Sequence, residues 1–66
     1  MSADDRLLPP REAAEYLGVG LIALRDWRYR RIGPPYIRLG HRTVRYRKSD
    51  LDAWLERQRV VMGSGE

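Results

Sequence analysis

The chain contains no cysteine and only one histidine, His41, in 66 residues. A disulfide framework is therefore excluded, and His41 has no cysteine or second imidazole with which it could share a structural zinc ion. A domain of this size buries only about 60% of the surface that its unfolded chain exposes. We expect a small core that is stabilised by packing alone, without a metal or another cofactor.

Long apolar runs are also missing, because no segment approaches the roughly 18 consecutive apolar residues of a membrane-spanning helix. The amino-terminal residues 1–5, MSADD, are acidic, whereas a secretory signal begins with basic residues and continues into an apolar segment. The sequence thus predicts a cytoplasmic protein with no membrane partner.

Groups that perform enzyme chemistry are scarce as well. His41 stands alone, Gly18-Val-Gly20 is too short to indicate a phosphate-binding loop, and 66 residues are few for enclosing a substrate pocket. We interpret His41 as a turn residue within reach of a phosphate. We expect neither enzymatic activity nor a small-molecule effector.

Arginine, in contrast, is abundant, and it is concentrated in the middle of the chain. Residues 1–15 and 49–66 each have a net charge of −2, whereas residues 16–48 have nine cations, one anion and a net charge of +8. Twelve of the 13 cations of the chain are arginine, whose planar guanidinium suits bidentate contacts with phosphate and guanine. This pattern favours a nucleic acid as a partner over a basic face that serves only solubility.

The first helix is expected to begin near Pro10, because proline suits the first helical turn. Ala13, Ala14 and Leu17 then form a narrow apolar stripe, and Gly18 suits a left-handed helix end. Only residues 18–20 separate this helix from the next periodic run. Two helices joined by a short turn with glycine indicate a helix-turn-helix.

The second helix is predicted over residues 21–30, with Leu24 and Trp27 facing inward. Trp27, like Trp54 later in the chain, is interpreted as a core residue. The outward face of this helix then carries Arg25, Asp26 and Tyr29.

Three side chains of this helix leave alternatives open. Leu21 and Ile22 cannot both share the inward stripe, so at least one is exposed, where it either contacts thymine methyl groups or covers the edge of the core. We favour the core for one of the two. Asp26 either pairs with Arg30, four residues on, or accepts a hydrogen bond from a cytosine amino group.

Residues 37–47, IRLGHRTVRYR, alternate apolar and polar side chains around one glycine and predict a β-hairpin after the helix-breaking Gly33-Pro34-Pro35. A two-residue loop, Gly40-His41 or His41-Arg42, places all the apolar side chains on one face, whereas a three-residue loop would set Leu39 opposite Thr43. We therefore predict a two-residue loop. The outer face of the hairpin would then present four side chains to a phosphate backbone, namely Arg38, Thr43, Arg45 and Arg47.

A last helix is predicted to begin with Ser49 as its cap and Asp52 completing a short capping box. Its apolar stripe comprises Leu51, Trp54, Leu55, Val61 and Met62, and Gly63 ends it. The predicted fold is a small α+β winged helix-turn-helix domain over residues 8–62, with a two-stranded hairpin as the wing and a C-terminal helix. Flexible tails are expected at residues 1–7 and 63–66.

These elements, in this order, resemble the winged helix-turn-helix domain of phage excisionases and related small regulators, within the wider mercury-resistance-regulator (MerR) type. The resemblance covers residues 8–57. It is carried by LLPPREAAEYLGV in the first helix and turn, by LRDWRYRRIGPPYIRLG from the second helix into the wing, and by VRYRKSDLDAWL in the return strand and last helix.

The resemblance implies that the second helix enters a DNA major groove and that the wing tip reaches an adjacent minor groove. The implied DNA-binding residues of the helix and its end are Leu21, Ile22, Arg25, Asp26, Arg28, Tyr29, Arg30 and Arg31. Those of the wing are Arg38, His41, Arg42, Thr43, Arg45, Arg47 and Lys48.

The resemblance also implies an excisionase, a recombination directionality factor that binds and bends attachment-site DNA in the nucleoid of a bacterial host. Its partners would be a tyrosine or serine integrase and neighbouring copies of itself. Two alternatives stay open. One is a stand-alone transcription regulator of the same MerR-like or AlpA-like type, and the other is a protein-interaction module that binds a recombinase.

Overall fold

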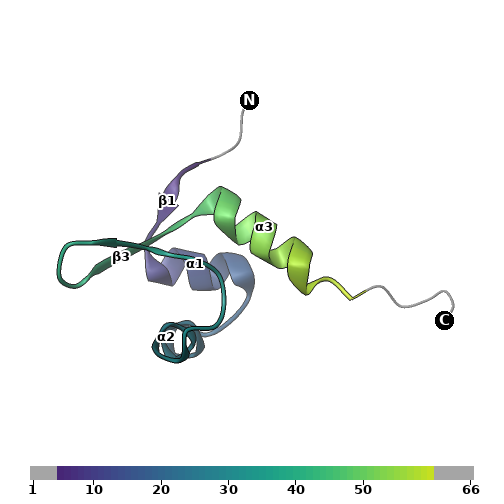
Figure 1. Cartoon of the computed structure of the whole chain (residues 1–66), viewed down its shortest axis with the longest axis horizontal. Helices are drawn as coiled ribbons and strands as arrows, with labels where there is room; N and C mark the ends of the chain where they lie inside the picture. The colour runs from purple at the N-terminus through teal and green to yellow at the C-terminus, as the bar shows by residue number, and fades with distance from the viewer. Residues whose placement is uncertain (1–4, 61–66) are drawn as a thin grey trace, which may run out of the picture.

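A helix-turn-helix, a hairpin and a final helix follow one another in the computed structural model, which describes residues 5–60 (Figure 1). The elements are β1 (Leu7–Leu8), α1 (Pro10–Leu17), α2 (Leu21–Arg30), β2 (Ile37–Leu39), β3 (Thr43–Arg47) and α3 (Lys48–Gln58). The strands form an antiparallel sheet in the order β1-β3-β2. The predicted winged helix-turn-helix fold is confirmed. Within the described residues, no helix is long and apolar enough to cross a membrane.

The helix-turn-helix forms where its proline and glycine residues predict the helix ends. Pro10 occupies the first turn of α1, and Gly18 ends the helix at a φ of 75° while its N–H bonds the carbonyls of Ala14 and Glu15. The left-handed region is accessible to glycine at little cost. α2 begins at Leu21 and ends at Arg30, the predicted bounds.

The core lies where α1, α2, α3 and β3 meet. Its buried apolar residues are Leu8, Ala13, Ala14, Leu24, Val44, Tyr46 and Leu51. Trp27 of α2 is half-buried against this cluster, and its ring centroid lies 5.6 Å from that of Trp54 in α3. The two tryptophans therefore join α2 to α3, in agreement with their predicted role in packing.

The strand β1 was not predicted, and the sheet has three strands rather than two. Leu7 pairs with Arg47 and Leu8 with Tyr46, and the Lys48 N–H bonds the carbonyl of Arg6 at 2.9 Å. Leu7 thus lies in the sheet, not in the amino-terminal tail to which the sequence assigned it. The sequence does not reveal β1, because two residues are too few to show the alternation of a strand and because their pairing depends on the free edge of β3.

The predicted two-residue hairpin loop is wrong, because the loop comprises the three residues 40–42. Leu39 pairs with Thr43, Arg38 with Val44 and Ile37 with Arg45. The physical reason is Gly40, whose φ of 83° admits a loop that begins in the left-handed region. Leu39 is consequently 48% exposed instead of facing the core.

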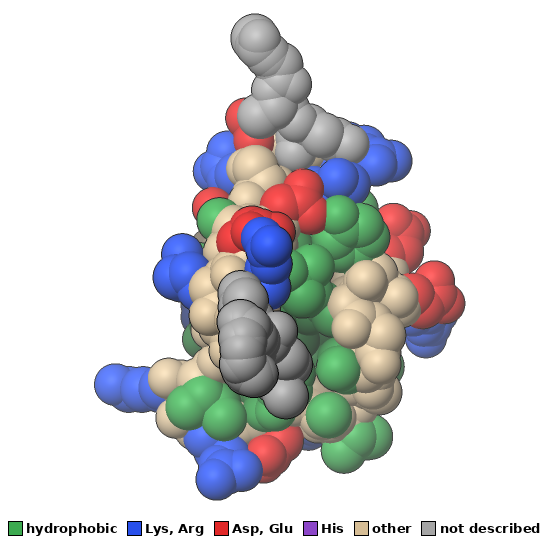
Figure 2. Space-filling view, turned by 90° about the vertical axis from the view of Figure 1, so that its right-hand side faces the viewer, with side chains coloured by type: hydrophobic (Ala, Val, Ile, Leu, Met, Phe, Trp, Pro, Cys, Tyr) green, Lys and Arg blue, Asp and Glu red, His purple; other side chains and the backbone are tan. Residues whose placement is uncertain are grey.

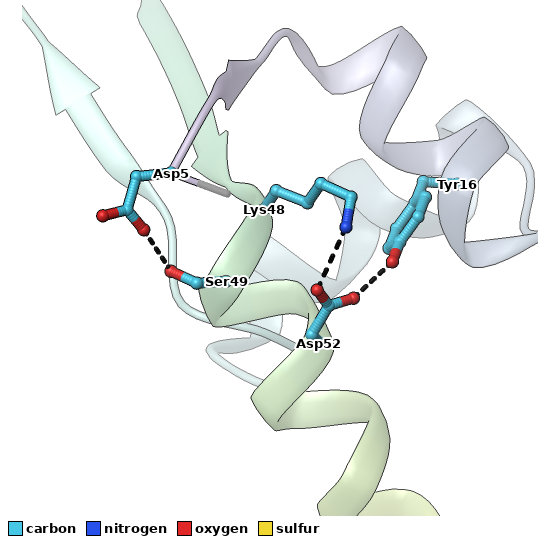
Figure 3. A network of polar contacts seen from close by, with 5 residues as sticks. All are labelled: Asp5, Tyr16, Lys48, Ser49 and Asp52. Atoms are coloured by element: carbon cyan, nitrogen blue, oxygen red, sulfur yellow. Dashed lines mark hydrogen bonds and ion pairs between the residues drawn. The ribbon is translucent and has the colours of Figure 1, made fainter. Parts of the chain in front are cut away.

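The predicted capping box at Ser49 is also wrong (Figure 3). α3 begins at Lys48, directly after β3, and no side chain caps it. Because the bond to Arg6 already satisfies the Lys48 N–H, the helix start needs less from a cap. Ser49 instead donates its hydroxyl to Asp5 at 2.7 Å, while Asp52 accepts from Lys48 at 3.2 Å and from the Tyr16 hydroxyl.

The predicted apolar stripe of α3 is present in part. Leu51 is fully buried and Trp54 is half-buried, whereas Leu55 is 37% exposed. α3 ends at Gln58, before the predicted end. The remaining predictions for this helix, at residues 61–63, lie outside the described residues.

Candidate nucleic-acid interface

A concave groove of about 580 Å³ separates the outward side of α2 from the hairpin. We call it the arginine groove, and it is lined by Arg25, Arg28, Tyr29, Tyr36, Arg38, His41, Arg42 and Val44. Four of these eight residues are arginines and none is acidic. Such a surface attracts a polyanion, because its cations come from two separate elements that both face one space.

α2 contributes the exposed side chains of Arg25 and Tyr29, both of which face outward as predicted. On the same outward face, farther from the groove, Arg30 Nη1 lies 3.3 Å from Asp26 Oδ2, which confirms the predicted ion pair. Both groups are more than half exposed, so the pair adds little stability. Arg30 nevertheless balances the charge of Asp26, the single acidic residue of this helix.

The amino-terminal turn of α2 differs from the prediction that one of its two aliphatic residues belongs to the core. Leu21 is 42% exposed and Ile22 is 73% exposed. The core side of this helix is occupied by Leu24, which is fully buried, and by Trp27. Ile22, two residues before Leu24, points to the opposite side of the helix, whereas Leu21, three residues before Leu24, lies at the edge of the core side.

Arg28 is held in place by two tyrosines that sequence reasoning did not assign to the site. Its Nη1 donates to the Tyr46 hydroxyl at 3.0 Å, and its guanidinium carbon lies 5.9 Å from the centroid of the Tyr36 ring. Burial raises the pKa of Tyr46 above its ordinary value of 10.0, although the hydrogen bond from Arg28 acts in the opposite direction. The phenol is therefore neutral at physiological pH and serves Arg28 as an acceptor.

Arg38 lies on the groove side of the hairpin, so its predicted place on the outer face is wrong. The three-residue loop pairs it with buried Val44, and its guanidinium carbon lies 5.9 Å from the Tyr36 ring centroid. Tyr36 precedes Arg38 by two residues and thus shares its side of the extended segment. That spacing was the only sequence signal for Tyr36. His41 and Arg42 complete the groove from the loop, and their contact with DNA stays a prediction.

Four other predicted wing residues are not among those that line the groove. Thr43 and Arg45 pair with Leu39 and Ile37 on the other face of the hairpin, and Arg45 Nη1 donates to the Val44 carbonyl at 2.8 Å. Arg47 Nε lies 3.7 Å from an Asp50 oxygen. Their DNA-binding role stays a prediction.

Lys48, the fourth, faces α1 instead of the wing (Figure 3). Its Nζ lies 5.0 Å from the centroid of the Tyr16 ring and 3.2 Å from Asp52 Oδ2. The hydrogen bonds with Tyr16 and Asp52 raise the pKa of Lys48 above its ordinary value of 10.5. Arg31, which follows α2, adopts a left-handed φ of 59° and lies beside the Gly33-Pro34-Pro35 turn rather than in the groove.

The face turned away from the wing has a different character (Figure 2). Hydrophobic side chains gather in its middle, and lysine or arginine side chains are mixed with aspartate and glutamate around them. The concentration of one sign of charge that marks the arginine groove does not occur on this face.

Comparison with known families agrees with the geometry. A family model described as a helix-turn-helix domain matches residues 7–59, which is most of the chain and includes every element from β1 to α3. No curated protein and no solved structure matches the chain.

Proposed function

Because the chain belongs to this helix-turn-helix domain family and is thereby a sequence-specific binder of double-stranded DNA, we propose that it serves as an excisionase-type architectural factor. It binds attachment-site DNA through the arginine groove, bends the duplex and so directs an integrase toward prophage excision. Copies on neighbouring sites act together.

The observation that carries this proposal is the placement of four arginines around one groove. Arg25 and Arg28 come from α2, whereas Arg38 and Arg42 come from the hairpin. A major groove about 12 Å wide admits α2, and the hairpin then lies over the adjacent backbone and minor groove. Contacts from two elements fix both the register and the orientation of the duplex.

The same arrangement favours bending. Smoothly bending a site of 20–30 base pairs costs on the order of 1–6 kcal/mol, and additional charged contacts offset that cost. A duplex on α2 that curves toward the hairpin would bring more of its phosphates near Arg38 and Arg42 than a straight one. Curvature is the property that an architectural factor supplies to a recombination complex.

The test is an electrophoretic mobility titration on DNA from around the gene and any adjacent attachment site, with random competitor. A circularly permuted probe set measures bending. We expect stepwise, sequence-selective complexes whose mobility depends on the position of the site in the probe. Selective binding without bending would favour the stand-alone transcription regulator. No selective complex would favour a protein-interaction module, for which the hydrophobic side chains in Figure 2 are the available surface.

A pair of charge-matched variants assigns any binding to the groove. Arg25→Ala with Arg42→Ala removes two groove cations, and Arg57→Ala with Arg59→Ala removes two from the end of α3. Both double variants lose the same net charge. We expect only the first to abolish the selective complex at moderate salt, and equal losses would contradict the proposed interface.

A further inference from the structure

The centre of the outward face of α2 is apolar, although its edges are charged. Ile22 is 73% exposed and Tyr29 is 82% exposed. Seven residues correspond to nearly two full turns, so the two side chains lie only about 20° apart around the helix axis. They stand opposite the buried Leu24, at the part of α2 that extends farthest from the core.

A shallow depression of about 200 Å³ lies between these side chains and is lined by Ile22, Arg25, Asp26 and Tyr29. Arg25 forms its edge toward the wing, since it also lines the arginine groove. Asp26 forms the opposite edge, where the Arg30 guanidinium at 3.3 Å balances its charge. The apolar centre is thus bordered by groups that tolerate or attract a polyanion.

The chemistry of the neighbours identifies what this apolar centre contacts. Phosphates and an acidic protein surface would both attract the arginines on this face, but the chain belongs to a helix-turn-helix family that binds DNA. A duplex in front of α2 presents its base edges to residues 22 and 29. In the major groove the one apolar group on a base edge is the C5 methyl of thymine. An isoleucine side chain packs on that methyl and excludes water from it.

Resting on the proposed DNA binding by α2, we propose that Ile22, flanked by Tyr29, selects thymine in the target site by packing against its C5 methyl group. Ile22 therefore determines sequence preference at one or two base pairs. The hairpin arginines supply affinity for the backbone, and Arg25 adds a base-edge contact of its own.

The test removes the methyl group from the DNA and the isoleucine from the protein, singly and together. The probe is the duplex that the full-length protein selects from a random library, prepared with deoxyuridine in place of each thymidine in turn. Deoxyuridine keeps every hydrogen-bonding group of thymidine and lacks only the methyl. Ile22→Ala is compared with Ile32→Ala, which shortens another isoleucine, 51% exposed, beyond the end of α2.

We expect deoxyuridine at one or two positions to weaken binding by the unaltered protein roughly fourfold, the value of one buried methylene-sized group. The same replacements should change binding by Ile22→Ala less than twofold, while Ile32→Ala should respond as the unaltered protein does. Equal sensitivity in Ile22→Ala, or no sensitive thymidine, overturns the inference while leaving selective DNA binding intact. A library that yields no preferred duplex overturns the proposed function and this inference together.

Discussion

At the scale of single residues, Arg28 connects α2 to the hairpin and the segment before it. Its guanidinium contacts the Tyr46 hydroxyl of β3 on one side and the Tyr36 ring on the other, and Arg38 contacts the same ring. Two arginines are thereby positioned beside one aromatic side chain. In the proposed complex, their long side chains would lose less conformational freedom on binding DNA, because part of it is already lost in the free protein.

The groove arginines of α2 and of the hairpin loop should differ in what they contribute to binding. Arg25→Ala should reduce the preference for the specific site by about 1–3 kcal/mol, because a base-edge contact is lost. Arg42→Ala should weaken binding to all duplexes similarly and reduce the magnitude of the salt slope by about 1. Titrations with specific and random duplexes at several salt concentrations measure both quantities.

Arg45→Ala is the control for this comparison. Arg45 lies on the other face of the hairpin and its side chain bonds the Val44 carbonyl at 2.8 Å, so its removal should affect binding less than removal of Arg42. A loss with Arg45→Ala that equals or exceeds the loss with Arg42→Ala would show that the duplex contacts the opposite face.

The pKa values of Tyr46 and Lys48 predict a loss of stability at alkaline pH. Both are raised in the folded protein, Tyr46 because of burial and Lys48 because of its bonds with Tyr16 and Asp52. The folded chain therefore holds these protons more tightly than the unfolded chain does. The free energy of unfolding should stay constant with respect to these groups below their ordinary values near 10 and fall as pH rises above them.

Urea unfolding from neutral to strongly alkaline pH measures this effect, with Tyr46→Phe as the informative variant. It should be about 1 kcal/mol less stable at neutral pH, because the hydrogen bond from Arg28 is lost. Its stability should then fall less steeply above pH 10 than that of the unaltered protein. Parallel plots of stability against pH for the two proteins would mean that the pKa of Tyr46 does not differ between the folded and unfolded chains.

At the scale of elements, β1 offers a comparison within one strand. Leu8 is 8% exposed and belongs to the core, whereas its neighbour Leu7 is 45% exposed. Leu8→Ala should reduce the free energy of unfolding by about 2–5 kcal/mol. Leu7→Ala should cost less than about 1 kcal/mol. Denaturant titration measures both, and equal losses would indicate that β1 does not pack as described.

Substitutions at two glycines distinguish the cost of backbone strain from the cost of steric crowding by an added Cβ. Gly33 and Gly40 have φ values of 87° and 83°, but a Cβ on Gly33 would lie 3.0 Å from Trp27 Cε3, whereas one on Gly40 would meet nothing within 4 Å. Gly40→Ala should cost about 1–2 kcal/mol from backbone strain. Gly33→Ala should cost more and disturb the contact between Trp27 and Trp54. Thermal melts with tryptophan fluorescence detect both effects, and the same cost for both variants would rule out the crowding.

The elements that the sequence predicted well are those with strong local signals. Pro10 and Gly18 mark the ends of α1, and the periodicity of Leu24 and Trp27 defines α2. The hairpin was recognised from its alternation, but its loop length depended on the backbone conformation of Gly40, which an apolar pattern does not encode. The resulting error moved Arg38 to the wrong face.

Other features depended on contacts between distant segments. β1 exists because β3 offers an edge to it. Ser49 does not cap α3 because the helix begins one residue earlier, at Lys48, whose N–H bonds the carbonyl of Arg6. The place of Tyr36 beside two arginines likewise depends on the meeting of α2 and the hairpin. Such pairings are decided by tertiary structure, and no local signal in the sequence identifies them.

At the scale of the whole molecule, the charge distribution predicts the salt dependence of DNA binding. Residues 16–48 carry a net charge of +8, whereas both ends of the sequence are acidic. About six phosphate contacts would give a plot of log affinity against log salt concentration a slope near −5. Binding titrations over a range of salt concentrations measure it. A slope close to zero would identify a partner other than a nucleic acid.

The strand order also limits how these molecules can meet when several are crowded together. The five-residue strand β3 lies in the centre of the sheet, while the edges belong to β1 with two residues and β2 with three. Edges so short offer little backbone on which another chain could align, which protects against aggregation. In the proposed assembly on DNA, neighbouring copies would therefore meet through helices or side chains rather than by joining their sheets.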